Sequence, residues 1–296
     1  MARPGRGRAH ALEDLEFARL GLLRKAKIWG GVVLGMALLQ LAFGVSLLSA
    51  SITLVLGALV IYVATRFFFG AIRVGFKQAV MPSLAEKVAP GLSYLADGAI
   101  EVHEFKQSGL FEDPDRYTGT DLFEGRVGQT QIRFGLLEAE EEYTVSSTDS
   151  NGDRQEDDKF RSIFTGMFFV ADGQRTLAGK TLVCPASSGL LSLFAGPGAD
   201  LQDPAFSKMF KVTSDSDLEA RRALTPSMIE RFKALHAKVG GFHASFHRGR
   251  VYIAVPMSLD TFKPKMLTPL TDPVQIEEAQ AALTSIVAIV ADLGLG

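Results

Sequence analysis

The sequence predicts an α+β protein in which an N-terminal transmembrane helical hairpin is followed by a mixed, mainly antiparallel sheet domain with packed helices. Two observations lead to this prediction. Residues 28–65 contain no Asp, Glu, Lys, Arg or His, and this run is nearly twice the roughly 20 residues that an apolar helix needs to cross a bilayer. From residue 122 onward the pattern changes to short runs of alternating apolar and polar residues, which are typical of strands.

Two helices over residues 28–48 and 52–69 account for the uncharged run, because a single helix of that length would be far longer than a bilayer is thick. Residues 48–51 are then the expected turn. Lys and Arg flank the outer ends of both spans and are missing from the turn: Arg24, Lys25, Lys27, Arg66, Arg73 and Lys77. Since such residues stay on the cytoplasmic side, both termini and the main domain are predicted to be cytoplasmic.

A cleaved signal peptide is the alternative to the hairpin, because small residues at 49–51 follow an apolar stretch behind basic residues. The apolar stretch is longer than the roughly 7–15 residues of a signal sequence, and a second span follows at once. The hairpin is therefore the favoured interpretation, and the lipid bilayer is the first expected partner.

Four segments are expected along the chain: a basic tail and juxtamembrane helix over 1–27, the hairpin over 28–69, a membrane-proximal stalk helix over 70–90 with a break at Pro82, and a cytoplasmic α+β domain over 91–296. The net charge of −2 argues against nucleic acid as a partner, because a nucleic-acid binder needs a basic face. The single cysteine, Cys184, cannot form an internal disulfide and is expected to be a small buried side chain.

Within the domain the alternating pattern predicts strands over residues 125–134, 140–145, 162–171, 180–184 and 209–214. Thr225 followed by Pro226 predicts the start of a helix that ends at Gly240. Residues 242–247 and 251–255 then read as a hairpin with its turn at 248–250.

A last helix is expected from Asp272 to about Leu293. Its acidic residues Glu277, Glu278 and Asp292 argue against a third membrane span.

Several local strings resemble a bacterial family known as domain of unknown function 3137. They are Tyr117-x-Gly119-x-Asp121-Leu122-x-Glu124-Gly125-x-x-Gly128-x-Thr130-x-Ile132-Arg133-Phe134, Phe164-x-Gly166-x-Phe168-Phe169-Val170-Ala171-Asp172, Gly179-Lys180-Thr181, Glu219-Ala220-Arg221 and Leu224-Thr225-Pro226-Ser227. The resemblance implies a multi-pass protein of the bacterial cytoplasmic (inner) membrane with a cytoplasmic domain. It implies no activity.

Two motifs resemble ligand loops without matching them. Residues 173–181 resemble a phosphate-binding loop, but five residues instead of four precede the final Gly-Lys-Thr, and a strand-like run follows where a helix should begin. Asp149, Asn151 and Asp153 have the spacing of the first calcium ligands. Arg154 stands where glycine is needed and Phe160 where a bidentate Glu is needed. We therefore expect an acidic hairpin loop over 149–158, with weak divalent-cation binding as the alternative.

The histidines His236, His243 and His247 invite a zinc interpretation. On one strand His243 and His247 would share a face but lie roughly 13 Å apart, which is too far to share one ion. A partly exposed strand face is the expected explanation, and no cofactor is predicted.

The remaining candidates for a functional site are charged residues within the strings quoted above: Asp121, Glu124, Arg133, Asp172, Lys180, Glu219 and Arg221. We find no catalytic motif among them, and whether the protein is an enzyme is left open. The favoured function is a membrane-tethered adapter, with a membrane protein or a second copy of the chain as its partner. The alternative is a hydrolase or small-ligand sensor that uses the Asp172/Lys180 and Glu219/Arg221 region.

Overall fold

The computed structural model describes residues 4–148, 154–173, 179–187, 201 and 203–292. The chain divides into two units, one formed by residues 1–83 with 263–279 and the other by residues 84–262 with 280–296. The protein is α+β, as expected. Among the described residues it has seven helices and eight strands.

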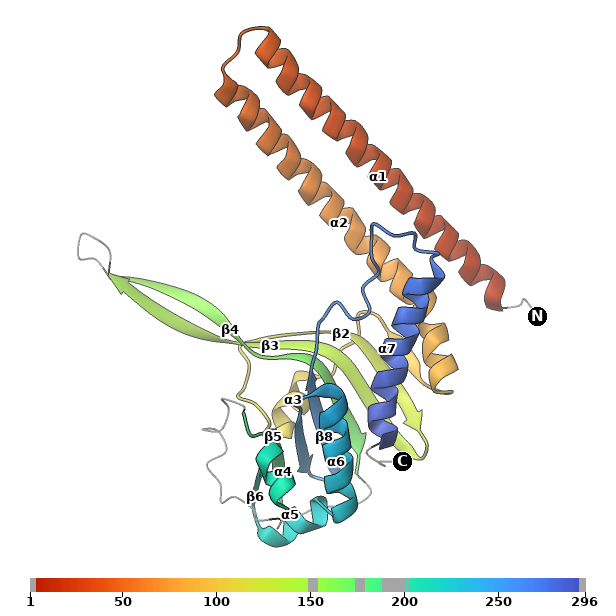
Figure 1. Cartoon of the computed structure of the whole chain (residues 1–296), viewed down its shortest axis with the longest axis vertical. Coiled ribbons are helices and arrows are strands. Elements are labelled where there is room, and N and C mark those ends of the chain that lie inside the picture. Colours follow the sequence, from red (N-terminus) through yellow and green to blue (C-terminus); the bar gives the residue numbers. More distant parts are fainter. Residues whose placement is uncertain (1–3, 149–153, 174–178, 188–200, 202, 293–296) are drawn as a thin grey trace. The chain divides into compact units, whose positions relative to one another are not determined.

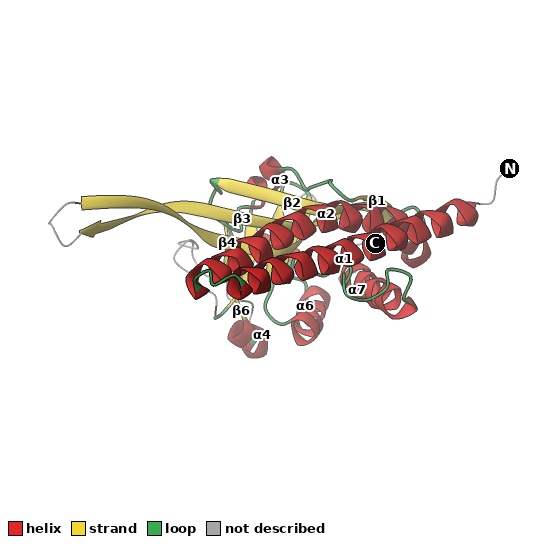
Figure 2. Cartoon of the chain, turned by 90° about the horizontal axis from the view of Figure 1, so that it is seen from above, coloured by secondary structure: helices red, strands yellow, loops and turns green. Residues whose placement is uncertain are grey.

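Two long helices, α1 (Pro4–Ala42) and α2 (Leu47–Val88), form most of the first unit. They run antiparallel, side by side (Figures 1 and 2). The turn between them lies at residues 43–46, where Gly44 adopts a φ of 73°. The turn expected at 48–51 is therefore wrong, and those residues open α2 instead. Glycine explains the difference, since it takes a positive φ without steric cost whereas Ser49 and Ser51 are compatible with helix.

The helices also extend beyond the apolar run. α1 already begins at Pro4, and α2 continues without interruption through Pro82 to Val88. The expected tail and stalk are thus parts of the same two helices. In the first unit Arg19 Nη1 donates to the Met266 carbonyl at 2.9 Å, and Glu16 Oε2 accepts from the Leu270 amide at 2.8 Å. These contacts hold the 263–279 segment against α1.

Two helices are long and apolar enough to cross a membrane, by length and composition alone, among the residues described: α2 and α7 (Pro273–Asp292). The most apolar stretch of α2 is only 6% buried, whereas that of α7 is 39% buried. Leu283, Ile286 and Val290 of α7 are almost fully buried. An amphipathic core helix explains α7, and the exposed apolar surface of α2 is the feature that suggests membrane association.

The second unit is built on one eight-stranded sheet with the strand order β1-β2-β3-β4-β8-β7-β5-β6. Every strand pairing that the structure describes is antiparallel, so the expectation of a mixed sheet is corrected to a fully antiparallel one. The strands are β1 (Ser93–Leu95), β2 (Arg116–Val127), β3 (Thr130–Thr148), β4 (Arg154–Asp172), β5 (Thr181–Pro185), β6 (Phe210–Ser214), β7 (His243–His247) and β8 (Arg250–Pro256).

Helices cover both faces of this sheet. The short helix α3 (Val102–Ser108) places Phe105 against Phe168 of β4, with ring centroids 5.4 Å apart, in a cluster of buried side chains. α4 (Pro204–Met209) lies between β5 and β6 in the chain, and α5 (Asp217–Ala223) and α6 (Pro226–Val239) lie between β6 and β7. Phe232 of α6 packs edge to face on Phe242, at 5.2 Å.

Local signals placed α6 and the β7–β8 hairpin correctly. The Thr225 side chain accepts from the Met228 amide at 3.3 Å, and Pro226 occupies the first turn of the helix. At the hairpin turn Arg248 and Gly249 have φ values of 51° and 71°, as a type I′ turn requires.

Candidate functional site: an acidic two-stranded arm

The longest strands of the sheet, β3 and β4, extend beyond their neighbours. Pairing of β2 with β3 stops at Arg116 opposite Glu140, and pairing of β8 with β4 stops at Pro256 opposite Gly166. Residues 141–148 of β3 and 154–162 of β4 therefore pair only with each other. We call these two segments the arm. Figures 1 and 2 show the arm projecting from the rest of the sheet.

Side-chain contacts inside the arm are exposed and few. Glu141 pairs with Arg161 across the strands, and the Thr144 hydroxyl donates to Asp158 Oδ1 at 3.1 Å. No arm residue whose side chain is described is buried, and Tyr143 is 42% exposed. Each exposed cross-strand pair contributes only about 0.2–1 kcal/mol. Two-stranded ribbons without a packed face are only marginally stable. The arm packs no described side chain into a core, so core packing does not explain its length.

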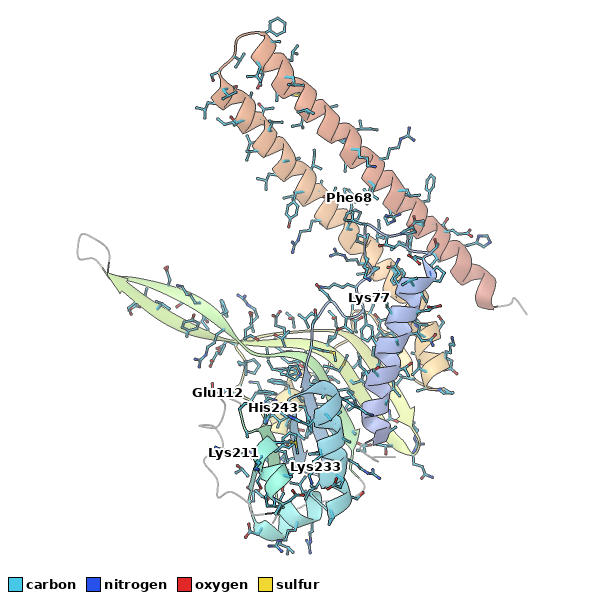
Figure 3. The ribbon with its side chains drawn as sticks, viewed as in Figure 1. Phe68, Lys77, Glu112, Lys211, Lys233 and His243 are labelled. Atoms are coloured by element: carbon cyan, nitrogen blue, oxygen red, sulfur yellow. The ribbon has the colours of Figure 1, made fainter. Side chains whose placement is uncertain are left out.

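The base of the arm is better anchored. The Arg116 guanidinium lies 3.6 Å from the centroid of the Phe160 ring, and its Nη1 is 3.5 Å from Glu140 Oε2. The Asp115 carboxylate accepts from the Glu142 amide at 2.8 Å. The arm is therefore anchored at its base. Along its outer part the side chains point away from both faces (Figure 3).

Negative charge is concentrated in the arm. The two segments of the arm contain five acidic residues and three basic ones, whereas the whole chain has 33 acidic and 31 basic residues. Glu140 at the base of the arm, and Asp149 and Asp153 in the sequence between the two segments, add three more acidic residues. Both outer edges of the arm also carry backbone groups without a neighbouring strand among the described residues. An acidic ribbon with open edges can add a partner strand by backbone hydrogen bonds, and its charge selects a basic partner.

Of the sequence-predicted site residues, Arg133 lies in a buried ion cluster. Glu104 on α3 is 1% exposed, and its Oε1 accepts from Arg133 and, at 2.6 Å, from Arg250 Nη1. Oε2 of Glu104 is buried without a hydrogen-bond partner. Sequence reasoning missed Glu104 and Arg250 because they lie 146 residues apart and carry no local motif. The cluster ties α3 to β3 and β8, which is a structural role.

Asp121 and Glu124 lie on β2 in different settings. Asp121 is fully buried with a φ of 58°, and its Oδ1 accepts from the Tyr94 hydroxyl at 2.5 Å. Burial and the neighbouring Asp121 raise the pKa of Tyr94, so the phenol stays protonated and serves as a donor. Glu124 is exposed opposite Arg133. Asp121 lies where the register of β2 with β3 shifts, between Thr120 and Phe123. The two carboxylates are therefore not brought together with a reactive group.

The Asp172/Lys180 and Glu219/Arg221 region is only partly assembled. The Lys180 amide donates to Asp215 Oδ2 at 2.7 Å, and Glu219 lies beside the neighbouring Gly179. Glu219 pairs with Arg222 at 3.2 Å, whereas Arg221 is exposed. Asp172 is exposed at the end of β4, opposite Arg250. The four residues do not form one constellation, and the cavity described below lies elsewhere.

Of the two ligand-loop motifs, the structure argues against the phosphate loop and leaves the calcium-type spacing untested. After Gly179 the chain enters β5 instead of a helix, which removes the amide cradle that a phosphate loop needs. Asp149, Asn151 and Asp153 lie outside the described residues. Among the residues that are described, no group of three or more His, Cys, Asp and Glu side chains could hold a metal ion.

His243 and His247 share one face of β7, as predicted, but the expected partial exposure is wrong for His243. It is 7% exposed, and its ring lies 5.1 Å from that of Phe111 (Figure 3). Burial lowers the pKa of His243 to about 4. Cys184 is also buried, and burial raises the pKa of its thiol to about 12. A protonated, enclosed thiol is a poor nucleophile.

Residues 162–295 match the model of a family described as "Protein of unknown function (DUF3137)". This match supports the resemblance to the DUF3137 family over this part of the chain. Comparison with curated proteins gives no match. Among solved structures the chain is similar to the crystal structure of the mycobacterial trehalose monomycolate transport factor A, with 10% identity and a TM-score of 0.37, over 74% of this chain and 96% of that one. A similarity this low says nothing about the function of this chain.

The DUF3137 segment begins at Ser162, the residue at which the arm joins the sheet. It includes the paired part of β4 and all elements from β5 to α7. The outer arm and the strings at 117–134 lie before the matched residues. The segment therefore supplies the second half of the sheet that carries the arm.

Proposed function

We propose that this protein is a membrane-tethered interaction protein whose acidic arm docks a positively charged partner. The single observation that carries the proposal is the arm: a ribbon with no buried side chain among those described, with open edges and an excess of acidic residues. The exposed apolar surface of α2 supports the tether.

The arm is suited to bind an extended basic segment, because it offers open strand edges instead of a pocket. A strand added to the edge formed by residues 143–148 or by residues 154–162 would gain backbone hydrogen bonds without rearranging the sheet. Acidic side chains along the ribbon would speed the encounter and reject acidic competitors. Because these charges are exposed, binding should weaken as salt is added.

Crosslinking in intact cells tests the proposal. A photoreactive amino acid replaces exposed Tyr143 on the arm, and the matched control replaces exposed Leu218 on α5. A product that forms from position 143 and not from position 218, with a partner segment rich in Lys and Arg, is the expected result. Absence of any product from position 143 in the native host contradicts the proposal.

The same proposal places both termini and the sheet domain in the cytoplasm. It rests on the basic residues that flank the uncharged run, for example Lys25 and Arg66. A reporter enzyme active only outside the cytoplasm, fused after Gly296, should be silent. Activity of this reporter would contradict the cytoplasmic orientation and would leave the docking role of the arm untested.

A small-ligand site at Lys180 and Glu219 is the second candidate function. One observation favours it: Glu219 Oε2 is buried without a hydrogen-bond partner beside the Gly179–Lys180 turn. Thermal unfolding of the full chain with added glycine tests it, because the ammonium of glycine can donate to Glu219 and its carboxylate can pair with Lys180. Stabilisation of the wild type that Lys180→Gln removes and Lys211→Gln keeps would support this site, and no stabilisation of the wild type would exclude glycine as its ligand.

A further inference from the structure

A cavity of about 610 Å³ lies between α1 and α2. Its walls come from both helices, from Leu22 to Met36 on α1 and from Thr53 to Phe68 on α2. At 1.5 Å per residue this part of α1 is about 21 Å long. The groove is therefore longer than one leaflet of a bilayer core, which is about 15 Å deep.

The two helices are in close contact at separate points, and small side chains leave the space between them that forms the groove. A Cβ at Gly57 would lie 2.4 Å from Cγ1 of Val33, so the helices are in close contact there. Nearer the turn, Thr53 Oγ1 donates to Gln40 Oε1 at 3.2 Å. Ala64 lines the groove with no side chain long enough to fill it.

The chemistry of the walls is apolar with one cation. Trp29, Val33 and Phe68 supply large apolar surface, whereas Lys25 lies just before the uncharged run begins. This order places an ammonium at the height of lipid headgroups when the apolar walls are in the bilayer core. The groove thus offers an apolar slot next to a site for a negatively charged phosphate.

We infer that this groove binds one acyl chain of an anionic phospholipid, with the lipid phosphate paired to Lys25. The inference rests on the proposed membrane tether, and it requires α1 to lie in the bilayer beside α2. A helix of a second copy is a poorer fit, because the uncharged run over residues 28–65 brings no anion to pair with the Lys25 ammonium. An acyl chain is thin enough to lie along the slot.

Trp29 allows a direct test, because it is the only tryptophan in the chain and it lines the groove. The full chain is placed in phosphatidylcholine vesicles that contain a minor fraction of acyl-brominated phosphatidylglycerol. Quenching of the Trp29 fluorescence by this lipid is compared with quenching by the same fraction of brominated phosphatidylcholine. One lysine near the surface contributes enough to give about a fivefold preference for the anionic lipid. Quenching at low mole fraction should show that preference.

Matched variants separate the groove from the surrounding lipid. Lys25→Gln should abolish the preference, whereas Lys27→Gln, two residues further and outside the groove lining, should keep most of it. Ala64→Phe fills the slot and should reduce quenching by the anionic lipid to the level of phosphatidylcholine. Ala58→Phe, exposed and outside the lining, should leave it unchanged.

Equal quenching by both brominated lipids overturns the inference, because it shows only the annular lipid that any span has. Weak quenching by both, with a crosslinked dimer, also overturns it and assigns the groove to a second copy. Flotation of the vesicles is measured in parallel. A chain that does not float with the vesicles contradicts the membrane tether itself, so the two failures are distinct.

Discussion

Removal of the Glu104 carboxylate should loosen the junction of α3 with β3 and β8. In Glu104→Ala two charged hydrogen bonds are lost, each of which contributes about 1.5–3 kcal/mol. The side chains of Arg133 and Arg250 are 28% and 35% exposed, so water replaces part of this loss, and a buried carboxylate no longer has to be desolvated. A net destabilisation of about 3 kcal/mol is expected.

Hydrogen exchange measured by mass spectrometry on the full chain locates this loss of stability along the sequence. A loss of about 3 kcal/mol corresponds to roughly 100-fold faster exchange of the most protected amides. We expect it in peptides that contain α3 and β8 and not in peptides from α1 or α2. Glu101→Ala is the control, because its side chain is 70% exposed one residue before α3. Equal protection in the two variants would refute the structural role of Glu104.

Three further predictions concern the sheet domain. Burial lowers the pKa of His243 to about 4 from 6.5, so the stability that comes from keeping this ring neutral is fully present above about pH 6.5. The free energy of unfolding should fall by up to about 3 kcal/mol as the pH drops toward 4, and His243→Gln should lose less stability over the same pH range. Gly166→Ala should destabilise by several kcal/mol, because its Cβ would lie 2.2 Å from the Val255 carbonyl oxygen, and soluble expression with denaturant titration checks it. Thr225→Ala should lose about 1 kcal/mol in the same titration, and wild-type stability would contradict its capping role.

Elements with local signals could be predicted from the sequence. The start of α6 followed from Thr225 and Pro226, and the β7–β8 turn followed from Arg248 and Gly249. In both cases the residues that form the feature are neighbours in the chain. The long uncharged run likewise predicted paired helices, although the turn shifted to Gly44 because its backbone conformation is not visible in hydropathy.

Features that depend on tertiary pairing could not be predicted. The ion cluster joins residues far apart in the chain, and neither Glu104 nor Arg250 belongs to a motif. The arm was missed for another reason. Residues 154–158 were expected to belong to the acidic loop that begins at Asp149, yet the structure places them in β4. A ribbon that buries neither face needs no apolar residues, so its pattern cannot show a strand.

Reversal of the charge of the arm shows whether acidic side chains dock the partner. Glu156, Asp157 and Asp158 are changed together to Lys in the chain that carries the photoreactive residue at position 143. The control chain carries Lys at Asp97, Glu101 and Glu112, which are exposed acidic residues elsewhere on the second unit. We expect the crosslinked product to disappear in the first chain and to persist in the second. A product of equal yield in both chains would contradict docking through the acidic arm.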